Sequence, residues 1–89
     1  MKVPHIVPVD KMGPYRIGTL NNVSVDDIEK VLGFKPNCKD DPNKVEYSWG
    51  FEVDGEYAAI WDYYGSHRLN SWSTYDPYGV LTQLFKGAN

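Results

Sequence analysis

Cysteine is almost absent from this chain, which has Cys38 alone among its 89 residues. An intramolecular disulfide is therefore excluded, and the start of the chain lacks the charged and apolar pattern of a secretory signal. No apolar run approaches the roughly 20 residues that span a bilayer. Glycine-rich phosphate-binding motifs are missing as well. These absences argue against a secreted, membrane-spanning or P-loop protein, and they predict an intracellular, cytoplasmic one.

Positive charge is also scarce. The chain has 9 Lys and Arg residues against 12 Asp and Glu residues, a formal net charge of -3. A protein that binds duplex nucleic acid or an anionic membrane normally presents a basic field, so both partners are excluded. A small anion held at one local site remains compatible with this balance.

Metal-binding and catalytic patterns are absent too. His5, Cys38 and His67 lie in three separate irregular segments without the spacing of metal ligands. Asp62 and Asp76 match no acid/base motif and are interpreted as local hydrogen-bonding or capping groups. The sequence therefore predicts no metal site, no cofactor and no catalytic residue, which means that we do not expect an enzyme.

The length and composition fit one small globular domain over residues 1–89, with 42% hydrophobic and 24% charged residues. A domain this short buries only about 60% of its unfolded surface. Without disulfides or a metal, association is the remaining source of stability, and a homodimer is the expected form.

Aromatic residues are abundant, at 15% of the chain. Apolar and polar residues alternate from Val45 to Val53, which predicts one strand of a β-hairpin over 45–64. Asp54-Gly55 is a typical two-residue hairpin turn, and counting outward from it fixes the register. One face then pairs Phe51 with Ala58, Trp49 with Ile60, Tyr47 with Asp62 and Val45 with Tyr64. The opposite face pairs Glu52 with Tyr57, Gly50 with Ala59, Ser48 with Trp61 and Glu46 with Tyr63.

The remaining segments complete an α+β fold. An N-terminal arm over 1–15 is extended because of its prolines, and residues 16–20 are compatible with a further short strand. Ser24 and Asp27 form a capping box that predicts a helix over 24–33. A strand over 69–75 and a helix over 77–86 follow. We therefore expect an antiparallel sheet of three or four strands with two helices on one face, in the order α-β-β-β-α after the arm.

The second face of the predicted hairpin is unusual, because small residues lie among large aromatic ones. Gly50, Ala59 and Ser48 form the floor of a shallow trough, and Tyr57, Trp61 and Tyr63 are its walls. Such a trough suits either a planar ligand or the same surface of a second subunit. Both interpretations stay open, as does the side of the sheet on which Trp72 and Tyr75 lie.

Arg68 stands in the loop between two aromatic-rich strands, beside His67, and Lys44 adds positive charge before the hairpin. A guanidinium with stacking rings is the minimal equipment for binding a nucleotide. An exposed loop arginine without a partner is the alternative. The candidate ligand-binding residues are Trp61, Tyr63, Arg68, Trp72, Tyr75, Tyr57, His67 and Lys44.

The pattern Lys44-x-Glu46-x-x-Trp49, Gly55, Ile60-Trp61-Asp62-Tyr63, Trp72 and a terminal helix resembles a group of small proteins encoded by tailed phages. The match covers about 25–85, with Trp61 where tyrosine is usual and Ser73-Thr74-Tyr75 in place of a glycine-containing stretch. Members of this group resemble anti-CBASS sponges, homodimers that sequester the cyclic nucleotide messengers of bacterial immunity. The resemblance implies non-enzymatic nucleotide binding in the cytoplasm of an infected bacterial host.

Two other functions remain as alternatives. An acidic face formed by Asp26, Asp27, Glu29, Asp40 and Asp41 suits a protein-interaction inhibitor, such as an anti-CRISPR, that occupies a basic nucleic-acid groove. An enzyme that cleaves a signalling nucleotide is the other alternative.

Overall fold

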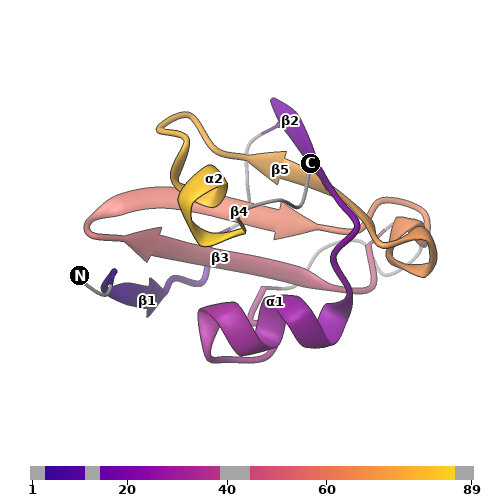
Figure 1. Ribbon diagram of the computed structural model, residues 1–89, viewed down its shortest axis with the longest axis horizontal. Helices are drawn as coiled ribbons and strands as arrows, with labels where there is room; N and C mark the ends of the chain where they lie inside the picture. The colour runs from indigo at the N-terminus through magenta and orange to yellow at the C-terminus, as the bar shows by residue number, and fades with distance from the viewer. Residues whose placement is uncertain (1–3, 12–14, 39–44, 86–89) are drawn as a thin grey trace.

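A computed structural model describes residues 4–11, 15–38 and 45–85 and confirms the α+β class (Figure 1). These ranges contain five strands, two helices and one 3₁₀ turn, η1, at Ser66–Leu69. The strands are β1 (Ile6–Pro8), β2 (Gly18–Asn21), β3 (Ser48–Val53), β4 (Glu56–Trp61) and β5 (Ser71–Tyr75). The helices are α1 (Val25–Leu32) and α2 (Val80–Leu84). Neither helix is long and apolar enough to cross a membrane, and no other α-helix occurs in these ranges.

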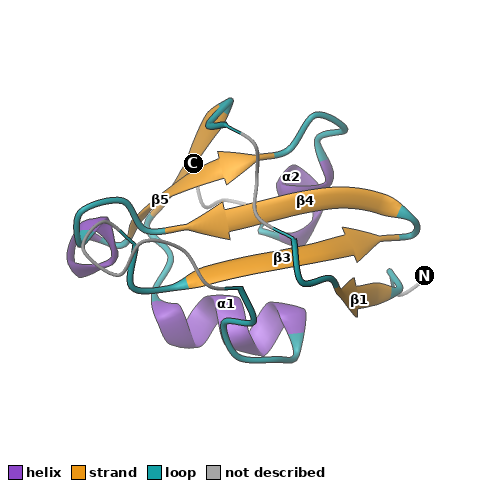
Figure 2. Ribbon diagram, turned by 180° about the vertical axis from the view of Figure 1, so that it is seen from behind, coloured by secondary structure: helices purple, strands orange, loops and turns teal. Residues whose placement is uncertain are grey.

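The sheet has five antiparallel strands in the order β1-β3-β4-β5-β2, so the prediction of three or four strands was too low. Both helices lie on the same face, as predicted (Figures 1 and 2). β1 and β2 form the two edges of the sheet, and β2 lies in the segment that was compatible with a further short strand. β1 comes from the segment predicted to be an extended arm, and in it Ile6 pairs with Val53 and Pro8 with Phe51. The prolines around β1 permit this pairing because it lies at an edge.

The central hairpin has the predicted register. Trp49 lies opposite Ile60, Gly50 opposite Ala59 and Ser48 opposite Trp61. Asp54 and Gly55 have φ angles of 51° and 87°, the positive values that this type of two-residue turn requires. β3 begins at Ser48 and β4 ends at Trp61, so the paired strands are shorter than the predicted range of 45–64. Val45 packs with Ala59 and Trp61 on the second face, not on the face that carries Trp49 and Phe51 as predicted.

Helix α1 is fixed by its caps. Ser24 Oγ accepts a hydrogen bond from the Asp27 N–H at 3.1 Å, and Asp27 Oδ2 accepts one from the Ser24 N–H at 3.0 Å. Gly33 ends the helix in the left-handed conformation at a φ of 89°. Both ends of α1 therefore lie where the sequence predicts them.

The capping box makes the stability of α1 dependent on pH. Its hydrogen bonds with Ser24 lower the pKa of Asp27 below the usual 3.8. The Asp27 carboxylate therefore binds a proton more readily in the unfolded chain than in the folded one. Its contribution to the stability of the fold is complete above the usual pKa and disappears as the pH falls through the lowered pKa. We expect Asp27→Asn to destabilise the fold at pH 7, with a difference from wild type that narrows towards pH 2. Urea unfolding at several pH values measures this difference, and one that stays constant with pH would contradict the prediction.

The C-terminal elements are shorter than predicted. Helix α2 begins at Val80, not at residue 77, because Gly79 adopts a left-handed φ of 70°. Asp76 still caps the helix, since its two carboxylate oxygens accept the N–H groups of Val80 at 2.8 Å and Leu81 at 3.1 Å. The predicted end at residue 86 lies outside the described residues. β5 begins at Ser71 because the residues before it form η1.

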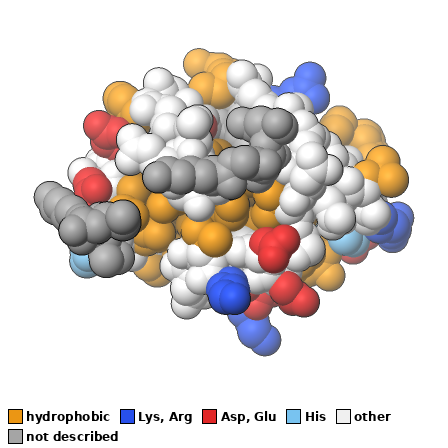
Figure 3. Space-filling view, viewed as in Figure 1, with side chains coloured by type: hydrophobic (Ala, Val, Ile, Leu, Met, Phe, Trp, Pro, Cys, Tyr) orange, Lys and Arg blue, Asp and Glu red, His pale blue; other side chains and the backbone are white. Residues whose placement is uncertain are grey.

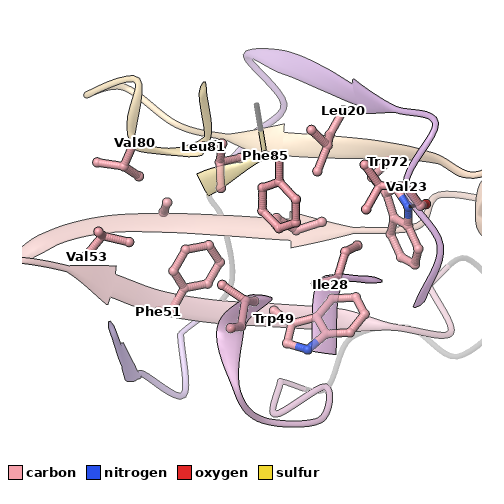
Figure 4. Close-up of a cluster of buried hydrophobic side chains, with 13 residues drawn as sticks. Leu20, Val23, Ile28, Trp49, Phe51, Val53, Trp72, Val80, Leu81 and Phe85 are labelled. Carbon is pink, nitrogen blue, oxygen red and sulfur yellow. Dashed lines mark hydrogen bonds between the residues drawn. The ribbon is translucent and has the colours of Figure 1, made fainter. Parts of the chain in front are cut away.

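The main core fills the space between the sheet and the two helices (Figure 4). Trp49 and Trp72 are buried side by side, with ring centroids 5.4 Å apart. The Trp72 indole donates to the Val23 carbonyl at 2.7 Å. The side of the sheet on which Trp72 lies is therefore the helix-covered side, and Tyr75 lies on the other, packed against Ala59 and Trp61.

The second face is partly covered by the chain itself. Figure 2 shows the segment after β1 crossing this face in front of β3. Val9 donates to the Gly50 carbonyl at 2.9 Å, and Asn37 Nδ2 donates to the carbonyls of Val9 and Gly50. The Cys38 thiol lies against the carbonyls of Val9 and Lys11. The floor of the predicted trough is thus occupied where Gly50 and Ala59 meet, and both residues are buried.

Candidate functional site

A hollow of about 310 Å³ remains on the second face, where β4 and β5 approach the start of β2. Arg16, Trp61, Tyr63 and Ser73 line it, and we call it the β4–β5 hollow. Trp61 is 8% exposed and Tyr63 is 47% exposed. Trp61 therefore contributes a mostly covered wall, while Tyr63 offers the more accessible ring.

The sheet positions these four residues. Trp61 and Ser73 are direct partners across β4 and β5. Arg16 stands just before β2, and the adjacent Ile17 N–H donates to the Thr74 carbonyl at 2.9 Å. Sequence reasoning selected Trp61 and Tyr63 but missed Arg16 and Ser73. Pairing of β2 with β5 brings Arg16 to the hollow, and a local pattern carries no signal of such a distant contact.

Tyr57 and Tyr75 are neighbours on the second face, with ring centroids 5.9 Å apart. The Tyr57 hydroxyl donates to the Lys11 carbonyl at 2.5 Å, and the Lys11 ammonium lies 5.0 Å from the centre of the Tyr57 ring. Burial raises the pKa of Tyr57 to about 12, with smaller contributions from Cys38 and Tyr75. The hydroxyl therefore stays protonated at neutral pH and holds the Lys11 segment against the sheet. Burial also raises the pKa of the Cys38 thiol, which therefore stays in its less nucleophilic form.

His67 and Arg68 gather with two carboxylates beyond the end of β4. Asp62 is fully buried, and its Oδ2 lies 2.5 Å from His67 Nδ1. Its Oδ1 accepts the N–H groups of Glu46 at 2.9 Å and Tyr47 at 2.7 Å. Glu46 Oε1 lies 3.5 Å from Arg68 Nη2. The interpretation of Asp62 as a local hydrogen-bonding group agrees with these contacts.

The predicted ligand-binding residues therefore separate into distinct groups. Trp61 and Tyr63 line the β4–β5 hollow, whereas the charged end of Arg68 meets Glu46 and His67 meets Asp62. Trp72 is only 1% exposed and belongs to the core, so its ring is not accessible to a ligand. Lys44 lies outside the described residues.

A second hollow, of about 170 Å³, lies on the helix side between β2, β5 and α2. Asp76 is the one ionisable residue that lines it within the described part of the chain. Because both oxygens of Asp76 already cap α2, this hollow offers less for ligand recognition than the β4–β5 hollow.

The described surface adds no support for a protein-interaction inhibitor with an acidic face. Asp26 and Asp27 are exposed on α1, but Figure 3 shows basic and acidic side chains mixed over this helix. Asp40 and Asp41 lie outside the described residues. A protein-interaction inhibitor therefore remains a prediction from the sequence.

Comparison of the chain with protein-family models, curated proteins and solved structures gives no significant match.

Proposed function

We propose that this protein binds and sequesters a cyclic nucleotide second messenger without cleaving it. The observation that carries the proposal is the composition of the β4–β5 hollow, which Arg16 lines together with Trp61 and Tyr63. A guanidinium fork binds phosphate oxygens, and an accessible aromatic ring stacks on a nucleobase. The sequence led us to expect this combination of a guanidinium and aromatic rings around Arg68, but in the hollow Arg16 supplies the guanidinium.

The choice of messenger and setting rests on the sequence resemblance over about 25–85. It favours a cyclic messenger of bacterial immunity and a site of action in the cytoplasm of a phage-infected host. Sequestration requires tight binding but no transition-state stabilisation. Among the described residues, Arg16, Trp61, Tyr63 and Ser73 line the hollow, and none of them has a carboxylate or imidazole that could act as a general base. This composition supports binding over turnover.

The size of the hollow bears on the proposed homodimer. Its volume of about 310 Å³ is close to the lower end of small-ligand pockets, which is roughly 300 Å³. A pocket of this size suits one nucleotide unit, whereas a cyclic dinucleotide has two. Two copies of the chain would present two hollows, one for each unit. The homodimer is therefore part of the proposal, and light scattering with and without ligand measures it.

Calorimetry tests the function directly. The panel consists of cyclic mononucleotides, cyclic dinucleotides and isomers of cyclic ADP-ribose. We expect one of these to bind with a Kd of ~1 µM or tighter, and heating the complex to release it unmodified. The absence of any binding tighter than ~10 µM would overturn the proposal. Release of a cleaved product would favour the enzyme instead.

Two variants and a matched control locate the site. Arg16→Gln removes the phosphate-binding charge and Tyr63→Leu removes the accessible ring, so each should weaken binding by about tenfold or more. Arg68→Gln removes the same charge elsewhere, next to Glu46, and should change the Kd by less than about twofold. If Arg68→Gln weakens binding as much as Arg16→Gln, the hollow is not the site.

A further inference from the structure

Three potential metal ligands gather beyond the end of β4, although nothing in the sequence spacing predicts them. Glu46, Asp62 and His67 each offer one ligand atom, and these atoms lie within 4.8 Å of one another. Glu46 precedes β3, Asp62 follows β4, and His67 lies in η1. The pairing of β3 with β4 brings the first two together, and η1 turns His67 back onto them.

Asp62 holds the His67 ring in one orientation. The Asp62 carboxylate is fully buried, and its Oδ2 lies 2.5 Å from His67 Nδ1. Two backbone N–H groups bind its other oxygen, so the carboxylate itself cannot rotate away. The Tyr47 ring packs edge-on against the imidazole, with centroids 4.8 Å apart. A carboxylate that binds one imidazole nitrogen in this way is the usual outer partner of a metal-ligating histidine, whose other nitrogen binds the ion.

Glu46 faces the other nitrogen. Its Oε2 lies 3.8 Å from His67 Nε2, which is too long for a hydrogen bond. Two ligands that each lie about 2.1 Å from one ion, at a tetrahedral angle, are separated by about 3.4 Å. The Glu46 side chain is 48% exposed, so a small rotation closes this difference, and solvent reaches the ion's remaining positions.

We propose that His67 Nε2 and the Glu46 carboxylate bind a divalent transition-metal ion of the zinc class, with Asp62 as the outer carboxylate and water as the remaining ligands. An imidazole and a carboxylate suit Zn²⁺, Ni²⁺ and Cu²⁺ better than Mg²⁺ or Ca²⁺, which prefer oxygen ligands alone. The site is separate from the β4–β5 hollow and does not rest on the proposed nucleotide binding.

Arg68 provides a further test of the metal site, because its guanidinium competes with a bound ion for the Glu46 carboxylate. Its Nη2 lies 3.5 Å from Glu46 Oε1, so the guanidinium opposes a cation at Glu46. Removing this charge should strengthen metal binding. We expect Arg68→Gln to lower the Kd for Zn²⁺ by about threefold or more, an effect that a merely structural role for the cluster would not produce.

Zinc titration of untagged, chelator-treated protein tests the site by calorimetry. We expect one ion per chain with a Kd of about 10 µM, and His67→Gln and Glu46→Gln should each weaken it at least about tenfold. The matched controls are His5→Gln, which changes the other histidine, and Glu52→Gln, which changes a carboxylate on β3. Each control should stay within about twofold of wild type. Failure of Zn²⁺ to bind below ~1 mM, or unchanged binding by His67→Gln, overturns the proposal.

Ring nitrogen NMR on the wild-type protein gives a second test that does not depend on any variant folding. Zinc should shift His67 Nε2 while the proton on Nδ1 remains, because Asp62 holds it. The His5 ring nitrogens should not shift. A shift at His5 alone, or loss of the proton on His67 Nδ1, contradicts the assigned geometry.

Discussion

Gly50→Ala is expected to destabilise the fold by about 2–3 kcal/mol and to lower its Tm by at least about 10 °C. A Cβ atom at Gly50 would lie 2.3 Å from the Lys11 carbonyl oxygen, 2.6 Å from that of Val9 and 3.0 Å from the Cys38 sulfur. Two of these neighbours are backbone atoms, so rotating a side chain cannot relieve the overlap. The segment around Val9 and Lys11 must move off the sheet. Thermal and urea unfolding measure the loss.

Gly18→Ala is the matched control, since Gly18 is also a strand glycine with ordinary backbone angles. Its added Cβ would lie 3.1 Å from the Thr74 hydroxyl, a side-chain group that can give way, so the cost should stay below about 1 kcal/mol. Cys38 supplies a local readout, because a displaced segment should let a thiol reagent modify it faster. Equal stability of the two variants would mean that the segment does not press on Gly50.

Asp62→Ala should cost about 3 kcal/mol or more, measured by urea unfolding in the presence of a chelator. It leaves two backbone N–H groups, of Glu46 and Tyr47, without their acceptor, and it removes the partner of His67. Asp76→Ala also removes a carboxylate that accepts two backbone N–H groups, but from a half-buried position at a helix end. That control should cost only about 1 kcal/mol. A similar loss of stability in both variants would mean that the burial of Asp62 does not determine the cost of removing it.

Asp62→Asn separates the two tasks of this carboxylate. The amide oxygen can still accept the backbone N–H groups, whereas its NH₂ group favours an unprotonated Nδ1 on His67. The ring proton then moves to Nε2 and blocks the proposed metal ligand. We expect Asp62→Asn to be more stable than Asp62→Ala yet to bind Zn²⁺ at least about tenfold more weakly than wild type. Wild-type zinc affinity in this variant would contradict the positioning role.

Local signals were enough to predict the middle of the sheet. The turn residues Asp54 and Gly55 determine the register of β3 and β4, and the capping box determines the start of α1. The edge strands could not be predicted in this way, because their pairing depends on contacts with distant segments of the chain. Ile6 lies opposite Val53 and Gly18 opposite Thr74, in each case across a long stretch of intervening chain. Proline-rich sequence is compatible with either an arm or an edge strand, and tertiary contact decides between them.

The same limit applies to the candidate sites. The register placed Trp61 on the second face, which was enough to select it. Arg16 enters the β4–β5 hollow only because β2 joins β5. The proposed zinc ligands could not be predicted for a related reason. The entire hairpin separates Glu46 from His67, and this separation matches no known spacing of metal ligands.

The order of the strands also has a kinetic consequence. Both edge strands precede α1, but their partners β3 and β5 follow it. The β3–β4 hairpin can nucleate early because its turn joins adjacent strands, whereas β1 and β2 must each close a long loop. We therefore expect the edges to form last during refolding. Until they do, β3 and β5 present unpaired ladders that recruit strands from other chains, so aggregation at high protein concentration is the expected competitor of folding.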